Sequence, residues 1–119
     1  MREWTLAVPQ MPLLSSNDRL HWAVKMKRVK ALRLTGMTLA KVRKIPPLEK
    51  AEIEVIVHPG NRTRRLDPSN YSSSAKPLID GIVDAGVLPD DNSRHLLRVS
   101  YVEGVRWPKT GIEIRVRAR

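Results

Sequence analysis

The sequence predicts a single α+β domain in which one mixed β-sheet packs against two main helices. Three observations predict this fold: short segments that alternate apolar and polar residues, two longer segments with helical spacing, and the element order β-α-β-α-β-β. A chain of 119 residues is long enough for one domain, residues 1–119, and too short for two ordinary ones.

The N-terminal half is expected to contain two strands and a long helix. Residues 1–8 alternate apolar and polar side chains, which predicts a short half-buried strand. The run of serine, asparagine and aspartate that ends at Asp18 supplies helix-capping oxygens, so the first helix is predicted to begin near Asp18 and to end before Pro46. Within this helix, Gly36 is the expected position of a bend or interruption. Residues 52–58 alternate clearly and predict the second strand.

The C-terminal half is expected to contain the second helix and the last two strands. That helix is predicted over about residues 75–85, with Pro77 tolerated because it falls in the first turn, and with Gly86 ending the helix. Residues 96–103 and 112–118 follow as two strands, the second with a regular alternation of Ile and Val. One mixed sheet covered by the two helices is the simplest way to bury these apolar faces.

Composition narrows the class of protein. The chain has no cysteine, which excludes disulfides, thiolate zinc sites and cysteine nucleophiles. It has no apolar run of membrane-spanning length, and its first residues lack the apolar stretch of a signal peptide, so a cytoplasmic protein with no membrane partner is expected. A net charge of +10 makes nucleic acid the expected partner. Charge alone does not separate an enzyme from a ribosomal or packaging protein.

The aspartates indicate a metal site. Five of the six lie between Asp67 and Asp91, a window whose only basic residue is Lys76, although the rest of the chain is strongly cationic. A divalent cation explains why carboxylates gather on a basic protein that binds a polyanion. Mg²⁺ is the expected ion, with Mn²⁺ as the alternative, because Mg²⁺ takes one or two carboxylates together with water and phosphate oxygens.

The spacing of these acids suggests how they meet. Asp67 follows one predicted strand, whereas Asp90 and Asp91 lead into the next. If those strands are neighbours, the carboxylates are expected to converge at one edge of the sheet. Asp80 shares a helical stripe with Lys76, an arrangement that also fits an ordinary solvated face with i,i+4 ion pairs. Beside a metal that activates water, Lys76 is expected to assist near the scissile phosphate.

Basic residues provide a candidate surface for phosphate groups. Nine Lys or Arg and no acid occur from Arg19 to Lys44, and three arginines shortly precede Asp67. A solvated face explains any one of them, but together they favour phosphate contact. With two asparagines, the nucleic-acid-binding candidates are Asn17, Arg19, Lys25, Lys27, Arg28, Lys30, Arg62, Arg64, Arg65 and Asn70. Trp22 fits packing better than base stacking, and the three histidines lack metal-ligand spacing.

A longer motif resembles a known family. It runs Arg64-Arg65-Leu66-Asp67-Pro68-Ser69-Asn70, then Lys76, Asp80, Gly86 and Asp90-Asp91, and before it come Pro12, Ser16-Asn17-Asp18-Arg19 and His21-Trp22. This series resembles the RusA-type Holliday-junction resolvases of bacteria and their phages. The resemblance spans nearly the whole chain. It implies a homodimeric, Mg²⁺-dependent endonuclease that resolves four-way DNA junctions by paired nicks, in recombination and repair.

The same resemblance implies roles for individual residues. Asp67 and Asp91 would hold the metal, and Lys76 would be the functional lysine. Ser69 stands where the family has a second acid. Compared with the family motif, three additional residues separate Asn70 from Lys76. The site is then expected to be completed by Asp80, by Asp90 or by water. Two other functions stay open: a junction- or duplex-binding protein that has lost cleavage through Ser69, and a basic RNA-binding protein.

Overall fold

The helices and strands follow one another in the predicted order. The computed structural model describes residues 2–119. Its elements are β1 (Glu3–Ala7), α1 (Trp22–Val42), β2 (Ala51–His58), the 3₁₀ helix η1 (Pro68–Tyr71), α2 (Ser72–Asp84), β3 (Leu96–Glu103) and β4 (Gly111–Ala118). The predicted α+β fold is confirmed, with η1 as an additional short element directly before α2.

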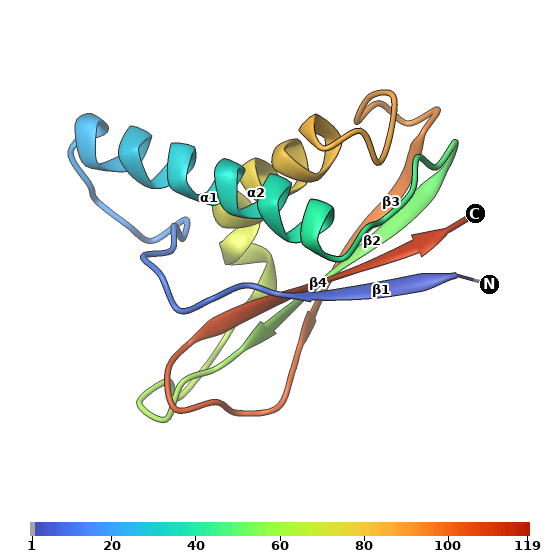
Figure 1. Cartoon of the computed structure of the whole chain (residues 1–119). Helices are drawn as coiled ribbons and strands as arrows, with labels where there is room; N and C mark the ends of the chain where they lie inside the picture. Colours follow the sequence, from blue (N-terminus) through green and yellow to red (C-terminus); the bar gives the residue numbers. More distant parts are fainter. Residues whose placement is uncertain (1) are drawn as a thin grey trace.

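A four-stranded mixed sheet with the strand order β1-β4-β2-β3 forms one layer, and both helices cover one of its faces (Figure 1). β4 is antiparallel to both neighbours, whereas β2 and β3 are parallel. Parallel neighbours need a crossover connection, which α2 provides. The end of β2 and the start of β3 therefore lie at opposite ends of the sheet. β2 and β3 are neighbours, as the expectation for Asp67 and Asp91 required, but their parallel pairing does not by itself bring the two aspartates to one edge.

The core lies between the sheet and the helices, as the alternation in β2 predicts. Ile53, Val55 and Val57 are each at most 1% exposed. They belong to one buried cluster with Leu78 and Ile82 of α2. Burial of each such side chain stabilises a fold by roughly 1.5–3 kcal/mol relative to exposure, so the helix layer is held chiefly by these contacts.

α1 and α2 touch through their backbones at two glycines. A Cβ atom at Gly36 would lie 2.1 Å from Leu78 O, and one at Gly81 would lie 2.0 Å from Arg33 O. Neither position has room for a side chain, so the two glycines set the close approach of the helices. α1 is continuous from Trp22 to Val42, so the helix is not interrupted at Gly36. The glycine serves helix packing instead.

The start of α1 differs from the prediction. The helix begins at Trp22 rather than near Asp18, and the His21 Nδ1 atom accepts a hydrogen bond from Ala23 N at 3.1 Å. Asp18 closes a separate turn, since its Oδ2 atom accepts from Ser15 N at 2.8 Å and its N–H donates to Ser15 O at 3.0 Å. Asp18, the predicted cap of the first helix, therefore stabilises the turn that precedes α1, and His21 caps the helix.

α2 also begins earlier than predicted, at Ser72 instead of about residue 75. η1 starts with Pro68 and runs directly into α2, so helical geometry is already established before the serine run. Pro77 consequently lies inside the helix and not in its first turn. Its ring is buried, and the backbone hydrogen bond that a proline cannot donate is missing at this point.

α1 is mostly exposed. Its buried residues are Leu32, Gly36 and Ala40, and the side chains of Lys25, Lys27 and Lys30 are open to solvent. Its length alone would be near that of a membrane span, but its charges rule out that use. Among residues 2–119, no helix combines the length and apolarity needed to cross a membrane.

The sheet face away from the helices carries matched charges. Arg115 Nη1 donates to Glu54 Oε1 at 2.7 Å, and Arg117 Nε donates to Glu3 Oε2 at 2.8 Å. Arg119 pairs with Glu52 in the same way. Since arginines and glutamates alternate here, the excess positive charge of the protein lies elsewhere, on α1 and in the loops.

Candidate metal and nucleic-acid site

Lys76 on α2 binds two aspartates from different parts of the chain. Its Nζ atom donates to Asp80 Oδ1 at 2.9 Å, one turn along the helix, and to Asp91 Oδ2 in the connection from α2 to β3. The Asp80 and Asp91 side chains are 26% and 34% exposed, and that of Lys76 is 62% exposed. We name these three residues the lysine–aspartate cluster. Solvent and a large ligand can both reach it.

The connection after α2 folds back so that Asp91 reaches the helix. Gly86 has φ 88° and ends α2, as the sequence predicted, because this left-handed conformation suits glycine. Val87 is buried, and its carbonyl accepts from Leu48 N at 2.7 Å. Asp90 Oδ1 then accepts from Asp91 N at 2.7 Å. These contacts fix the turn that directs the Asp91 carboxylate toward Lys76.

The charges in the cluster stabilise the ionised forms of Lys76 and Asp91. The hydrogen bond from Lys76 holds the pKa of the Asp91 carboxyl below its usual value. Hydrogen bonds to Asp91 and then to Asp80 raise the pKa of the Lys76 ammonium. Lys76 and Asp91 are therefore both ionised across the neutral pH range.

The cluster fits part of the requirement for a small divalent cation. Oxygen atoms of Asp80 and Asp91 approach one point from two elements, and Mg²⁺ binds through one or two carboxylates together with water and phosphate oxygens. The Lys76 ammonium lies at that point, so a metal has to displace it. Among residues 2–119, no three His, Cys, Asp or Glu side chains lie close enough to form a fuller ligand set.

Asp67 is not a hydrogen-bonded member of this cluster. It caps η1, where its Oδ1 atom accepts from Ser69 N at 3.2 Å and from Ser69 Oγ at 2.8 Å. Over the described residues, no hydrogen bond or ion pair joins Asp67 to Lys76 or to Asp91. Ser69 therefore acts as a hydrogen-bond donor to Asp67.

Asp90 and Asn70 make local contacts. Asp90 Oδ2 accepts from Asn92 Nδ2 at 3.3 Å, so both oxygens of this carboxylate help to shape the turn before β3. The backbone carbonyl of Asn70 accepts from Ser16 N at 2.8 Å, which ties the N-terminal loop to η1. That bond places Asn17, the next residue, beside the start of α2.

Two of the candidate phosphate-binding residues share a pocket near the start of α2. Arg19 and Lys25 line a cavity of about 290 Å³ together with Ser72 and Ser73. The Ser73 hydroxyl is buried, and within residues 2–119 it has no hydrogen-bond partner. Arg28 behaves differently: its Nη1 atom donates to Leu13 O at 3.0 Å, so it anchors α1 on the preceding loop.

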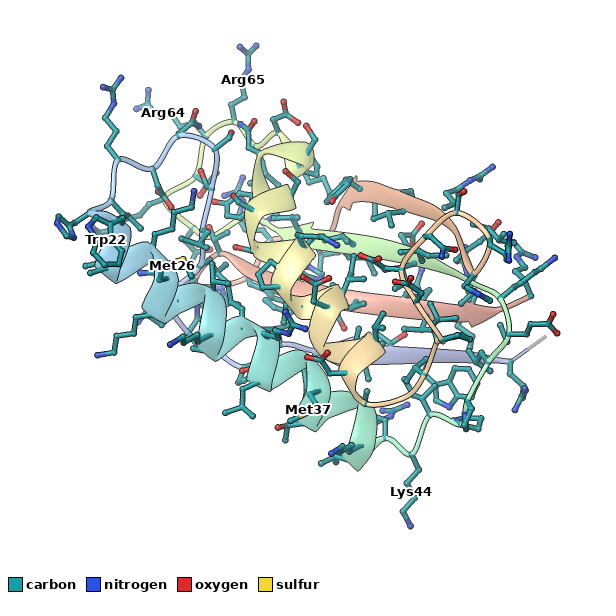
Figure 2. All side chains as sticks on the ribbon, turned by 90° about the horizontal axis from the view of Figure 1, so that it is seen from above. Trp22, Met26, Met37, Lys44, Arg64 and Arg65 are labelled. Carbon is teal, nitrogen blue, oxygen red and sulfur yellow. The ribbon has the colours of Figure 1, made fainter. Side chains whose placement is uncertain are left out.

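The remaining candidates are exposed. Lys27 and Lys30 are exposed on α1, and Arg62, Arg64 and Arg65 are exposed in the loop before η1. In Figure 2, Arg64 and Arg65 project at the end of the molecule where α1 begins, which is also where Trp22 lies, and Lys44 projects at the other end. Trp22 is 72% exposed, so it does not have the packing role that the sequence suggested.

A buried histidine at the end of β2 is a feature that sequence reasoning missed. His58 is 4% exposed and stacks on Trp107, with ring centroids 3.7 Å apart and planes inclined by 5°. Its Nδ1 atom lies 2.8 Å from Val105 O, and its Nε2 atom lies 2.6 Å from Glu113 Oε1. No local pattern links these residues, because they are far apart in the chain and only strand pairing brings them together.

Comparison with known proteins adds no identification. No model of a known protein family matches the chain, and no curated protein matches it.

Proposed function

We propose that the chain is a Mg²⁺-dependent endonuclease that cuts branched DNA, with four-way junctions as its substrate, and that it acts as a homodimer. The observation that carries this proposal is the approach of Asp80 and Asp91, from two separate elements, to one cationic nitrogen. Carboxylates arranged around a positive centre, on a protein of net charge +10, suit an ion that meets a phosphate.

The residues of the cluster take different roles in this proposal. Asp80 and Asp91 would hold the ion, and Asp90 keeps Asp91 in place through its turn. When bound, Mg²⁺ supplies charge neutralisation at the phosphate and activation of water. Lys76, once released from the carboxylates, has an exposed and flexible side chain that can follow the negative charge developing on the phosphate. Asp67 with Ser69 lies before α2 and supplies a further carboxylate for an approaching substrate and its ions.

The basic residues account for the choice of a branched polyanion. Arg19 and Lys25 near the start of α2, and the arginines of the loop before η1, provide positive charge that no glutamate of the open sheet face offsets. A four-way junction has two-fold character, and a symmetric dimer presents two such surfaces. Light scattering at several protein concentrations tests the dimer; a monomer at all of them, with and without junction DNA, contradicts it.

Labelled synthetic four-way junctions test the activity. We expect paired nicks with Mg²⁺, none with EDTA, and a loss of at least about a hundredfold in rate for Asp91→Asn, since charge stabilisation at a reacting phosphate contributes that order. Asp80→Asn is expected to lose less. Asp84→Asn, one helical turn beyond Asp80, is the matched control and should cut normally. Junctions that stay intact at every Mg²⁺ and Mn²⁺ concentration would falsify the proposal.

A second candidate is a junction-binding protein that does not cut. Two observations favour it: the Lys76 ammonium already neutralises Asp91, and a neutral hydroxyl at Ser69 lies against Asp67. Such a protein binds junctions but never nicks them, and Ser69→Asp is expected to introduce Mg²⁺-dependent cutting. Competition among junction DNA, duplex DNA and structured RNA separates both candidates from an RNA-binding protein.

A further inference from the structure

Two loops at one end of the sheet line an open pocket that is separate from the lysine–aspartate cluster. The loop after β2 and the loop before β4 run side by side below the sheet in Figure 1. The pocket between them has a volume of about 510 Å³. The lining includes Asn61, Arg62, Thr63, Pro108, Lys109 and Thr110, and it contains no acidic residue.

Hydrogen bonds between the loops hold the pocket in shape. Gly60 N donates to Thr110 Oγ1 at 3.1 Å, and Asn61 N donates to Pro108 O at 3.2 Å. The Arg106 guanidinium crosses between the loops and donates to Thr63 O at 2.8 Å and to Gly60 O. The pocket is therefore formed before any ligand arrives, which lowers the entropy lost on binding.

The loop before β4 is also braced from inside the protein. His58 at the end of β2 stacks on Trp107 and contacts Val105 O. A Cβ atom at Gly104 would lie 2.4 Å from the His58 ring, and one at Gly111 would lie 2.5 Å from the Trp107 ring. Both ends of the loop are thus packed too closely for any larger residue. A solvent-facing loop fixed at this many points is better explained by binding than by connection alone.

Three positive charges surround the pocket. Arg62 and Lys109 are exposed, and neither forms an ion pair within the part of the chain that the structure describes. Arg106 directs its donors at carbonyl oxygens, which satisfy its hydrogen bonds but leave its charge in place. The Thr63 and Thr110 hydroxyls hydrogen-bond to each other at 3.4 Å, which leaves one hydroxyl proton for an oxyanion. Two cations without ion pairs and one hydroxyl donor, with no carboxylate in the lining, match a phosphate group.

We propose that this pocket binds a backbone phosphate of DNA, with Arg62 and Lys109 as its principal contacts. The inference rests on the proposed function only in taking DNA as the ligand, and it does not require cleavage. It extends the DNA-binding surface to the end of the sheet where β2 stops, beyond the residues on α1. The pocket would thereby hold an arm of the substrate while the lysine–aspartate cluster faces another phosphate.

The salt dependence of binding in EDTA tests the pocket without involving catalysis. We compare the double variant Arg62→Gln/Lys109→Gln with the matched control Lys41→Gln/Lys50→Gln, which removes the same charge from exposed positions near the other end of the sheet. On duplex DNA, log K falls with log salt, and each lost phosphate contact makes this slope less steep by about 0.9. The slope of the pocket variant should therefore be about 2 less steep than that of the wild type. The control should retain the wild-type slope. An unchanged slope in the pocket variant, or an equal loss in the control, overturns the proposal.

Nuclear magnetic resonance separates the possible ligands. Adding a short duplex should shift the backbone amide signals of Lys109 and Thr110 in the wild type and not in the double variant. Inorganic phosphate alone is the second probe: if it shifts these signals and the duplex does not, the pocket is a small-anion site and the DNA proposal fails. If the pocket variant shows the expected change in slope but the wild type nicks no junction with any metal, the pocket proposal is supported and the nuclease proposal is contradicted. Wild-type protein that binds no DNA overturns both.

Discussion

The Lys76 ammonium donates to the Asp91 carboxylate, fifteen residues further along the chain, and in doing so joins α2 to the connection before β3. The same nitrogen donates to Asp80, so two carboxylates share one internal cation. This arrangement keeps the acids close together without a metal. It also means that any divalent ion at this place competes with a charge that the protein itself supplies.

Replacing Lys76 with glutamine is expected to separate metal binding from cleavage. Without the ammonium, the pKa of Asp91 should rise, because its main stabilising hydrogen bond is lost. The freed carboxylates should bind Mn²⁺ roughly 3- to 10-fold more tightly, the size of effect of about one exposed charge pair. Junction cleavage should nevertheless fall. Carboxyl NMR titration and Mn²⁺ calorimetry measure these effects; Lys41→Gln serves as control, and weaker Mn²⁺ binding in Lys76→Gln contradicts the competition.

The Asp91 pair should also make stability depend on pH in the acidic range. The pKa of Asp91 is lower in the folded protein than in the unfolded chain, so its contribution is present above the unfolded value of about 4 and is lost as pH falls through the folded value. Because the pair is partly exposed, we expect roughly 0.5 kcal/mol. Urea unfolding of wild type and Asp91→Asn should differ by this amount at pH 6.5 and converge near pH 2. A difference in unfolding free energy that grows as the pH falls would contradict this prediction.

Gly81→Ala is expected to disrupt the contact between α1 and α2. The added methyl group would lie 2.0 Å from Arg33 O, a backbone atom that cannot move without the whole helix. Overpacking of this kind should lower the free energy of unfolding by about 3 kcal/mol and the melting temperature by roughly 10 °C. Gly86→Ala is the comparison, since that position has open space but a left-handed backbone, and it should lose only about 1–2 kcal/mol. Calorimetry that finds the two variants equally stable contradicts the role of Gly81.

His58→Ala is expected to loosen the pocket between the two loops without changing its surface charges. The variant loses the stack on Trp107 and the contact to Val105 O, and it leaves Glu113 without its partner, which should destabilise the protein by roughly 2 kcal/mol. Amide hydrogen exchange at Lys109 should accelerate, and DNA affinity should drop at unchanged net charge near the pocket. His95→Ala, at the opposite end of the sheet, controls for the loss of an imidazole. Unaltered amide exchange at Lys109 would show that the contacts of His58 do not stabilise the loop before β4.

Much of the fold could be predicted because its information is local. Alternation of Ile53, Val55 and Val57 identifies a strand with one buried face whatever its partners are, and Gly86 marks the end of a helix by its own backbone preference. The helix starts were predicted less well. Asp18 and His21 both carry capping atoms, and the choice between them depends on which turn Ser15 forms.

The candidate site could be predicted in its composition but not in its pairing. The excess of aspartates in one window predicts a site that includes Asp67, Asp80, Asp90 and Asp91. In the structure, two of them, Asp80 and Asp91, are joined through Lys76. Which two are joined follows from the parallel pairing of β2 and β3 and from the turn that Asp90 closes. Neither feature is encoded in the spacing of the acids.

The sequence by itself determined the element types and their order, because side-chain periodicity and backbone preference act over a few neighbouring residues. Only the tertiary structure decided the strand order β1-β4-β2-β3, the glycine contact between α1 and α2, and the stack of His58 on Trp107. These depend on packing between segments distant in the chain, where many pairings satisfy the same local pattern and only the complete core selects one.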